Sequence, residues 1–407
     1  MKDNQKKLLI LGGGSNQVPL IEASKNMGYF TFVCDARDSI EGVLLADEHV
    51  SLDYMDRDAV LRVAKEKNID GIISNSEPAM LNVAYISQEL GLPGNSIESI
   101  ETLLSKEKFR KLQGSIDGIY SPEHFIIASL DELFEKLEVM NYPVIIKPTE
   151  CSGTRGTTRI DSFDHSLITE TYSMCKEFSR NNLVSIEEYV EMRSLRVNDA
   201  DVFVVDDGIL WDGTLWEDRS PDAPMLPMTE IFPMALPDRD FVQIKDAVNK
   251  ILMEAGVKHG EFNVETYFTT NHEVFVIEIN PRQAGNYIPQ LIKEHTGVDL
   301  TKLLVSTAVG DMTYFDELKS FERENNFITC QVVFAKSDGI YQGLYIDPQV
   351  KKYVQWIKEE YAFGDKVEKG VNAANAVAFV DLRFDNYETQ HKFTDEIEKY
   401  VYAKILK

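Results

Sequence analysis

Two carboxylates and one amide stand at spacings that can place three oxygen ligands side by side. Residues 274–280 alternate as an extended strand does, so Val276, Glu278 and Asn280 are predicted to share one face. Residues 261–268 form a second alternating run, which puts Glu265 on its polar face. The short polar stretch between the two runs is typical of a hairpin turn. The hairpin would bring Glu265, Glu278 and Asn280 onto one surface.

This oxygen-rich surface predicts a hard metal ion. Two carboxylates and an amide suit Mg²⁺ shared with substrate phosphates better than a metal that prefers soft ligands. Arg282 comes two residues after Asn280, where its guanidinium can hold a phosphate or a carboxylate in a fork. The periodicity alone is equally typical of a solvated hairpin with ordinary surface carboxylates.

A lysine at the end of an apolar strand precedes a loop of small residues. Residues 142–148 contain Lys147, and the loop reads Ser152-Gly153-Thr154-Arg155-Gly156-Thr157. Backbone N–H groups of such a loop can wrap phosphate oxygens while the lysine neutralises their charge. The loop is not a Walker A motif, because no GKS or GKT follows. A plain turn between two strands is the competing interpretation.

The first hundred residues alternate strand and helix, which predicts a parallel sheet with right-handed crossovers. Asp56 is expected to cap the second helix. The strands are predicted at 7–11, 30–34 and 71–74, and the helices at 17–27, 57–67 and 79–90.

The glycine turn after the first strand is a weak dinucleotide signal. Gln17 stands where the third glycine of GxGxxG is needed, although Asp35 lies about where a ribose-binding acid would be. A glycine turn at a helix N-terminus can still hold another anion. Gly13 and Glu77 are therefore candidate substrate contacts at the carboxyl edge of the sheet. Glu77 is equally well explained as the start of the next helix.

The later chain predicts further elements around these motifs. Asp218-Arg219 falls in a proline- and methionine-rich segment, 217–237, that is expected to be an irregular loop; the pair would line a substrate pocket or form a surface ion pair. The last eighty or so residues alternate strand and helix without a new motif. Helices are predicted at 97–113, 163–179 and 241–255 and from Asn286 onward, and strands at 183–190, 201–205 and 209–215.

The motifs in this order resemble the ATP-grasp superfamily. The resemblance rests on Ile277-Glu278-Ile279-Asn280-Pro281-Arg282 with Asn263-Val264-Glu265 upstream, and it is strongest to carboxylate–amine (amino-acid) ligases and carbamoyl-phosphate-synthase-like members. It implies an α/β protein in which an N-terminal Rossmann-like pre-ATP-grasp domain (1–104) is followed by a two-lobed ATP-grasp fold. The lobes would be a lid (105–190) and a large subdomain (191–407).

The resemblance also implies the nucleotide and metal contacts. ATP and Mg²⁺ or Mn²⁺ are the implied cofactors, with Arg282 and Lys147 as catalytic residues. The implied metal ligands are Glu265, Glu278 and Asn280. The implied ATP contacts are Lys106, Lys147, Ser152, Gly153, Thr154, Gly156, Thr157, Glu187, Glu188 and Val190. The family often has a glutamate for the ribose near position 194, where this chain has a serine, so Ser194, Glu191 or a water molecule is expected to take that contact.

Composition excludes other partners. The 407 residues carry 42 basic and 67 acidic side chains, a formal charge of −25, which disfavours binding to nucleic acid or anionic lipid. No apolar run reaches the length of a membrane span, so a cytoplasmic protein is expected. The four cysteines lack CxxC spacing and are expected to be reduced thiols. Whether the chain forms a homodimer is left open.

The implied activity joins a small carboxylic acid to an amine through an acyl phosphate, with release of ADP and phosphate. Two alternatives are a nucleotide-binding sensor or scaffold without turnover and a nicotinamide-dependent oxidoreductase. The oxidoreductase would leave Lys147 and the Glu265, Glu278 and Asn280 set unexplained.

Overall fold

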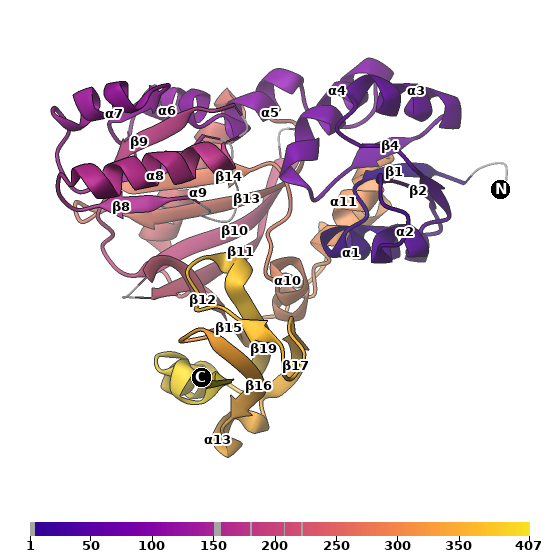
Figure 1. Ribbon diagram of the computed structural model, residues 1–407. Coiled ribbons are helices and arrows are strands. Elements are labelled where there is room, and N and C mark those ends of the chain that lie inside the picture. The colour runs from indigo at the N-terminus through magenta and orange to yellow at the C-terminus, as the bar shows by residue number, and fades with distance from the viewer. Residues whose placement is uncertain (1–4, 150–155, 180, 207, 221–222) are drawn as a thin grey trace.

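The computed structural model describes residues 5–149, 156–179, 181–206, 208–220 and 223–407, with the side chains of 223–225 outside that description. An N-terminal unit and a lid flank one long central sheet, and a small C-terminal sheet lies at its far end (Figure 1). In the described part of the chain no helix is both long and apolar enough to cross a membrane.

The N-terminal unit confirms the predicted parallel sheet. Its four strands pair in the order β3-β2-β1-β4, all parallel. Asp56 caps α3 as predicted, accepting a hydrogen bond from the Ala59 N–H at 3.0 Å. The short β3 lacks an apolar run and was not predicted. The elements are β1 (Lys7–Leu11), β2 (Phe30–Cys34), β3 (Glu48–Val50), β4 (Gly71–Ile73), α1 (Val18–Asn26), α2 (Glu41–Leu45), α3 (Arg57–Lys67) and α4 (Met80–Leu90).

The lid is an antiparallel sheet with two helices packed on one face. Its strand order is β6-β9-β7-β8. Val144 and Ile146 of β7 point into a core shared with the helices, and alternation therefore places Lys147 on the other face. The elements are β6 (His124–Ile127), β7 (Val144–Pro148), β8 (Thr158–Ile160), β9 (Val184–Glu188), α7 (Leu130–Leu137) and α8 (His165–Phe178).

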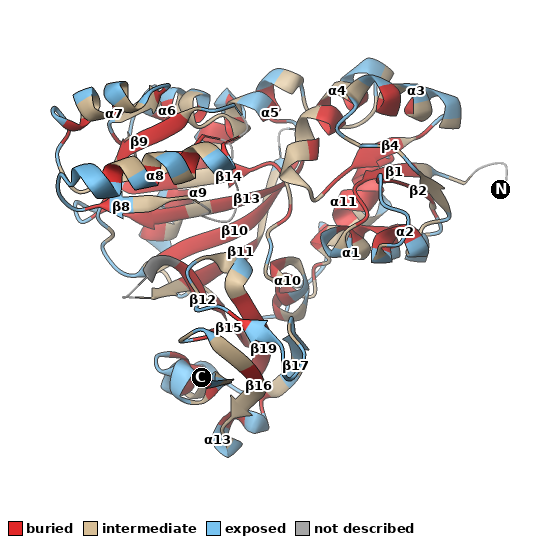
Figure 2. Cartoon of the chain, in the orientation of Figure 1, coloured by how far each residue is buried: buried red, intermediate tan, exposed pale blue. Residues whose placement is uncertain are grey.

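The central sheet has nine strands in the order β17-β19-β15-β12-β11-β10-β13-β14-β5, antiparallel except where β5 joins β14. Its strands are buried along much of their length (Figure 2). Val202 and Val204 of β10 pack with α5, α6 and α9, whereas Phe203 and Val205 pack with α10 on the opposite face. The strands are β5 (Ile119–Tyr120), β10 (Arg196–Val205), β11 (Gly208–Ser220), β12 (Ala223–Phe232), β13 (His259–Phe268), β14 (Val274–Asn280), β15 (Phe327–Phe334), β17 (Val354–Glu359) and β19 (Ala376–Phe384). The helices are α5 (Ile97–Leu104), α6 (Lys106–Gly114), α9 (Asp238–Glu254), α10 (Ile288–Thr296), α11 (Leu300–Ala308) and α12 (Thr313–Leu318).

The predicted hairpin is β13 and β14, but one residue was placed on the wrong face. The strands pair with Glu265 opposite Glu278 and Asn263 opposite Asn280, and a register shift follows Glu265. The shift inserts an extra residue and reverses the alternation. Val276 therefore lies in the core with Ile279 rather than beside Glu278.

The segment expected to be an irregular loop is mostly strand. Residues up to Ser220 extend β11, and β12 follows and pairs with both β11 and β15. Pro227 misled the prediction, since proline is normally excluded from central strands. Here Pro227 pairs with Arg219 between two register shifts, where the ladder is already interrupted.

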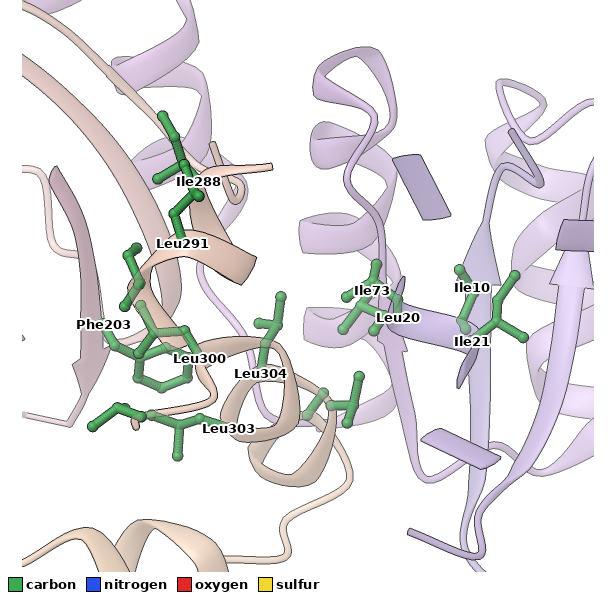
Figure 3. Packing of buried hydrophobic residues seen from close by; sticks show 14 of the residues in the cluster. Ile10, Leu20, Ile21, Ile73, Phe203, Ile288, Leu291, Leu300, Leu303 and Leu304 are labelled. Atoms are coloured by element: carbon green, nitrogen blue, oxygen red, sulfur yellow. The ribbon is translucent and has the colours of Figure 1, made fainter. Parts of the chain in front are cut away.

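Later residues complete the N-terminal unit and add a small sheet. Leu303 and Leu304 of α11 belong to one core with Leu20 and Ile73 of the N-terminal unit (Figure 3). A separate C-terminal core covers the end of the central sheet, which the sequence did not indicate. Its elements are β16 (Gly339–Ile346), β18 (Lys366–Val367), β20 (Val401–Leu406), α13 (Pro348–Lys351) and α14 (Tyr387–Thr394).

Candidate active site

The predicted metal ligands lie together on one face of the β13–β14 hairpin. Glu265 and Glu278 are direct cross-strand partners, and Asn280 is two residues along β14. Asn280 donates its side-chain amide to Glu278 Oε1 at 2.8 Å, and Glu265 Oε2 accepts from Arg219 Nη2 at 2.9 Å. Paired carboxylates at these positions repel each other, and a cation bound between them would relieve that repulsion.

Three predicted phosphate-binding cations interact electrostatically with Glu278. Burial alone would raise the pKa of Glu278, but Lys106, Arg282 and Lys147, with the hydrogen bond from Asn280, hold it below its usual value. Glu265 behaves in the opposite way. Burial, with repulsion from Glu278 and Glu217, raises the pKa of Glu265 to about 7 although Arg219 opposes the change. The two carboxylates therefore face different surroundings, and the cations gather on the side of Glu278.

Lys147 is held by a buried ionic triad. Its Nζ atom lies 2.8 Å from Glu187 Oε2, and Arg110 Nη2 lies 3.2 Å from the same oxygen. Burial lowers the pKa of Lys147 to about 8, with Arg110 and Lys106 acting in the same direction and Glu187 opposing them. Sequence reasoning missed Arg110, because an arginine on a helix face is normally solvated.

The other residues implied as nucleotide contacts near the end of β9 have varied surroundings. Glu188 accepts from the Tyr120 hydroxyl at 2.7 Å, and the Val190 carbonyl accepts from the Tyr267 hydroxyl at 2.7 Å. Ser194 is exposed in the segment before β10, as is Glu191. Their contacts with ATP stay predictions.

Part of the implied phosphate loop, residues 152–155, falls outside the described residues, and with it the predicted contacts Ser152, Gly153 and Thr154. Gly156 and Thr157 lead into β8. Gly156 has a φ of 73°, and a Cβ atom there would come within 3.0 Å of Pro148 and Phe178. Gly156 thus has a local steric reason to be glycine, separate from any contact with nucleotide.

The N-terminal unit reaches the site through the loop after β4. Arg282 Nη2 lies 3.6 Å from Glu77 Oε2, and both side chains are partly exposed. Beside them, Asn75 Nδ2 donates to Gln283 Oε1 at 3.0 Å. These contacts join the carboxyl edge of the parallel sheet to the residues that follow β14.

The backbone groups of Gly13 in the glycine turn are hydrogen-bonded to other residues of the N-terminal unit. The Gly13 N–H donates to Asp35 Oδ2 at 2.9 Å, and the Gly13 carbonyl accepts from the Gly42 N–H at 3.0 Å. Asp35 also binds the Arg37 guanidinium, and the buried Gln17 side chain lies against Gly12. The Gly13 N–H and the Asp35 carboxylate, which a dinucleotide would need, already form hydrogen bonds within the N-terminal unit. This geometry therefore does not favour dinucleotide binding.

A buried group of acids beside the metal ligands was not predicted. Arg219 is ion-paired with Glu217 and Glu265, and only 7% of its side chain is exposed, so it is not part of a surface pair. Burial, with repulsion among the acids, raises the pKa of Asp199 and of Glu230 well above the usual range. Asp199 and Asp201 share a face of β10, and that spacing was an available signal. Glu230 was hidden because β12 was expected to be a loop.

Comparison with known proteins finds distant relatives, at 22–25% identity. No family model matches the chain. The chain is 25% identical over 305 residues to the alanine–anticapsin ligase of Bacillus subtilis, covering 69% of this chain and 62% of that protein. It is 24% identical over 340 residues to the carbamoyl phosphate synthase large chain of Buchnera aphidicola, covering 75% of this chain and 29% of that protein. The chain thus spans under a third of the length of that synthase subunit.

Solved structures share the whole fold. An L-amino acid ligase from Bacillus licheniformis superposes with a TM-score of 0.81 at 18% identity, covering 100% of both chains. The chain has the ATP-grasp fold. The biotin carboxylase domain of the Hydrogenobacter thermophilus 2-oxoglutarate carboxylase, solved with MgADP, ADP and bicarbonate, superposes at 0.71 with 16% identity, covering 99% of this chain and 91% of that one. A phosphoribosylglycinamide synthetase from Anaerococcus prevotii superposes with a TM-score of 0.73 at 20% identity, covering 99% of this chain and 100% of that one.

Proposed function

We propose that this ATP-grasp protein is an ADP-forming ligase that joins a carboxylic acid to an amine through an acyl phosphate. The observation that carries the proposal is the gathering of Lys106, Lys147 and Arg282 around Glu278, which stands directly opposite Glu265. Three cations beside paired carboxylates suit the transfer of a phosphoryl group, because that chemistry depends on positioning and charge neutralisation.

The residues of the hairpin fit Mg²⁺. Glu265, Glu278 and Asn280 offer hard oxygen atoms, and the mutual repulsion that raises the pKa of Glu265 would be relieved by a cation. Among the described residues, no group of three or more histidine, cysteine, aspartate or glutamate side chains could hold a metal. Two carboxylates and an amide instead suit a metal that also takes oxygens from ATP. Bound there, Mg²⁺ would neutralise charge on the β- and γ-phosphates.

The chain's own residues have separate tasks. Lys106 and Lys147 would bind phosphate oxygens of ATP, and Arg282 would orient the substrate carboxylate towards the γ-phosphate. Attack by that carboxylate gives ADP and an acyl phosphate. The amine nitrogen then attacks the acyl carbon, and phosphate leaves with the proton that the nitrogen gives up.

The substrate side of Arg282 suits an amino acid. Arg282 and Glu77 carry opposite charges at partly exposed positions, matching a carboxylate and an ammonium group that are close together. The alanine–anticapsin ligase and the L-amino acid ligase support this choice, since their names describe the ligation of amino acids.

The test is product analysis with purified protein, Mg-ATP and an array of amino acids and other small acids and amines. We expect ADP, phosphate and a product whose mass is the sum of the two substrates less one water. AMP and pyrophosphate would replace the acyl phosphate with an adenylate. Binding of ATP without turnover of any pair would favour a sensor, and tight binding of NADH without ATP would favour an oxidoreductase.

A further inference from the structure

Glu187 was implied to contact the nucleotide, yet its carboxylate is occupied by the protein. Oε2 lies 2.8 Å from Lys147 Nζ and 3.2 Å from Arg110 Nη2, and Oε1 accepts from the Ser185 hydroxyl at 3.3 Å. Only 5% of the Glu187 side chain is exposed. A carboxylate with both oxygens engaged in this way is poorly placed to bind adenine.

Arg110 shares the Glu187 Oε2 atom with Lys147 and also contacts β14. Its guanidinium donates to the Val276 carbonyl at 3.0 Å and to the Ile277 carbonyl at 2.9 Å, both on the strand that carries Glu278. The same group contacts Glu187 on β9, and Glu187 contacts Lys147 on β7. The triad of Arg110, Glu187 and Lys147 therefore connects α6, the lid sheet and β14.

Lys147 needs a counter-ion to stay charged. Of its side chain only 14% is exposed, and two cations of α6, Arg110 and Lys106, face it. Burial and like charges both favour the neutral amine. Among the described residues, Glu187 on β9 is the carboxylate ion-paired with Lys147, while Glu278 on β14 interacts with it electrostatically.

We propose that Glu187 is a positioning residue, which keeps Lys147 protonated and aimed at the ATP phosphates without touching the nucleotide. The inference rests on the proposed function, because it assumes that Lys147 binds ATP. Burial and the neighbouring cations already bring the pKa of Lys147 down to about 8. Removal of Glu187 would lower it further, so the lysine would lose its charge within the working pH range.

The test is the affinity for Mg-ATP, measured by calorimetry at pH 6 and pH 8 without acid or amine. In Glu187→Gln the loss of affinity relative to the unchanged protein should be small at pH 6. At pH 8 it should reach about tenfold or more, the scale of one lost charge-assisted hydrogen bond. Comparing two proteins at each pH cancels the titration of ATP itself. Adenosine, which lacks phosphates, should bind both proteins equally.

Two further variants separate charge from structure. Glu187→Asp keeps the carboxylate and should restore much of the affinity at pH 8. Arg110→Gln removes a cation that depresses the pKa of Lys147, so the affinity should persist to higher pH. Equal losses at both pH values, or a matching loss of adenosine binding, would overturn the counter-ion role. Failure of the unchanged protein to bind Mg-ATP at any pH would overturn the proposed function instead.

Discussion

Substitution of Arg219 would measure how much its guanidinium stabilises the buried acidic side chains around it. Its side chain is only 7% exposed and is ion-paired with Glu217 and Glu265. Asp199 and Glu230 also interact with it. Arg219→Met keeps much of the side-chain volume but leaves four acids around an apolar group. The protein must then either bury uncompensated charge or bind protons.

The expected cost is large and depends on pH. Removing one partner of a buried ion pair costs about 3–5 kcal/mol. The pKa of Glu265 is already about 7 with Arg219 present, and removal of the cation would raise it further. Between the unfolded pKa, ~4.3, and that raised value, the folded protein binds more protons than the unfolded chain. The stability of the folded protein therefore falls as pH rises through this window. Relative to the unchanged protein, the variant should lose more free energy of unfolding at pH 8 than at pH 5.

Urea unfolding of metal-free protein at pH 5 and pH 8 measures this difference. Arg196→Met is the matched control, because Arg196 pairs with Asp218 at 2.8 Å but is 36% exposed. An exposed pair contributes roughly 0–1 kcal/mol. Arg219→Lys should recover part of the loss by restoring a charge. If Arg219→Met lost no more stability than Arg196→Met, or lost the same amount at both pH values, the acids would not depend on Arg219 as argued.

Three further variants test the remaining assignments. Glu278→Gln keeps the shape of the proposed metal ligand and should lower kcat by about 10²-fold or more, with an unchanged melting temperature; full activity would remove Glu278 from the metal site. Lys147→Ala should weaken Mg-ATP binding and turnover together, and unchanged nucleotide affinity in a titration would contradict its role. Burial and Glu294 raise the pKa of Asp381 to about 9, so an aspartate at this position costs stability increasingly above its unfolded pKa. Asp381→Asn should stabilise the protein by about 1–3 kcal/mol at pH 8 and have little effect at pH 4 in urea titrations.

Local patterns in the sequence were enough for the hairpin and the N-terminal sheet. Alternation predicted that Glu265 and Glu278 would share a surface, because strand pairing converts a period of two into cross-strand neighbours. Alternation could not reveal the register shift beside Glu265, since one extra residue leaves no mark in composition. Val276 was misplaced for that reason.

The side-chain partners within the site depend on contacts between distant segments. Glu187 and Arg110 are 77 residues apart, and no local pattern couples them. The family resemblance assigned Glu187 to the nucleotide, whereas the structure surrounds it with Lys147 and Arg110. Similarly, Glu230 joins Asp199 and Glu217 only because β12 is a strand of the central sheet.

The N-terminal unit can contribute to substrate binding by only part of its carboxyl edge. Gly13 has both backbone groups engaged and is packed against Val33, Ile40 and Val43, so a side chain there would clash. The loop after β4 is different, since Glu77 faces Arg282 at 3.6 Å with both side chains partly exposed. Ionic groups that are accessible and loosely paired can exchange partners with a ligand at small cost. We therefore expect the N-terminal unit to act on the substrate through Glu77, with the glycine turn supporting the helix that follows it.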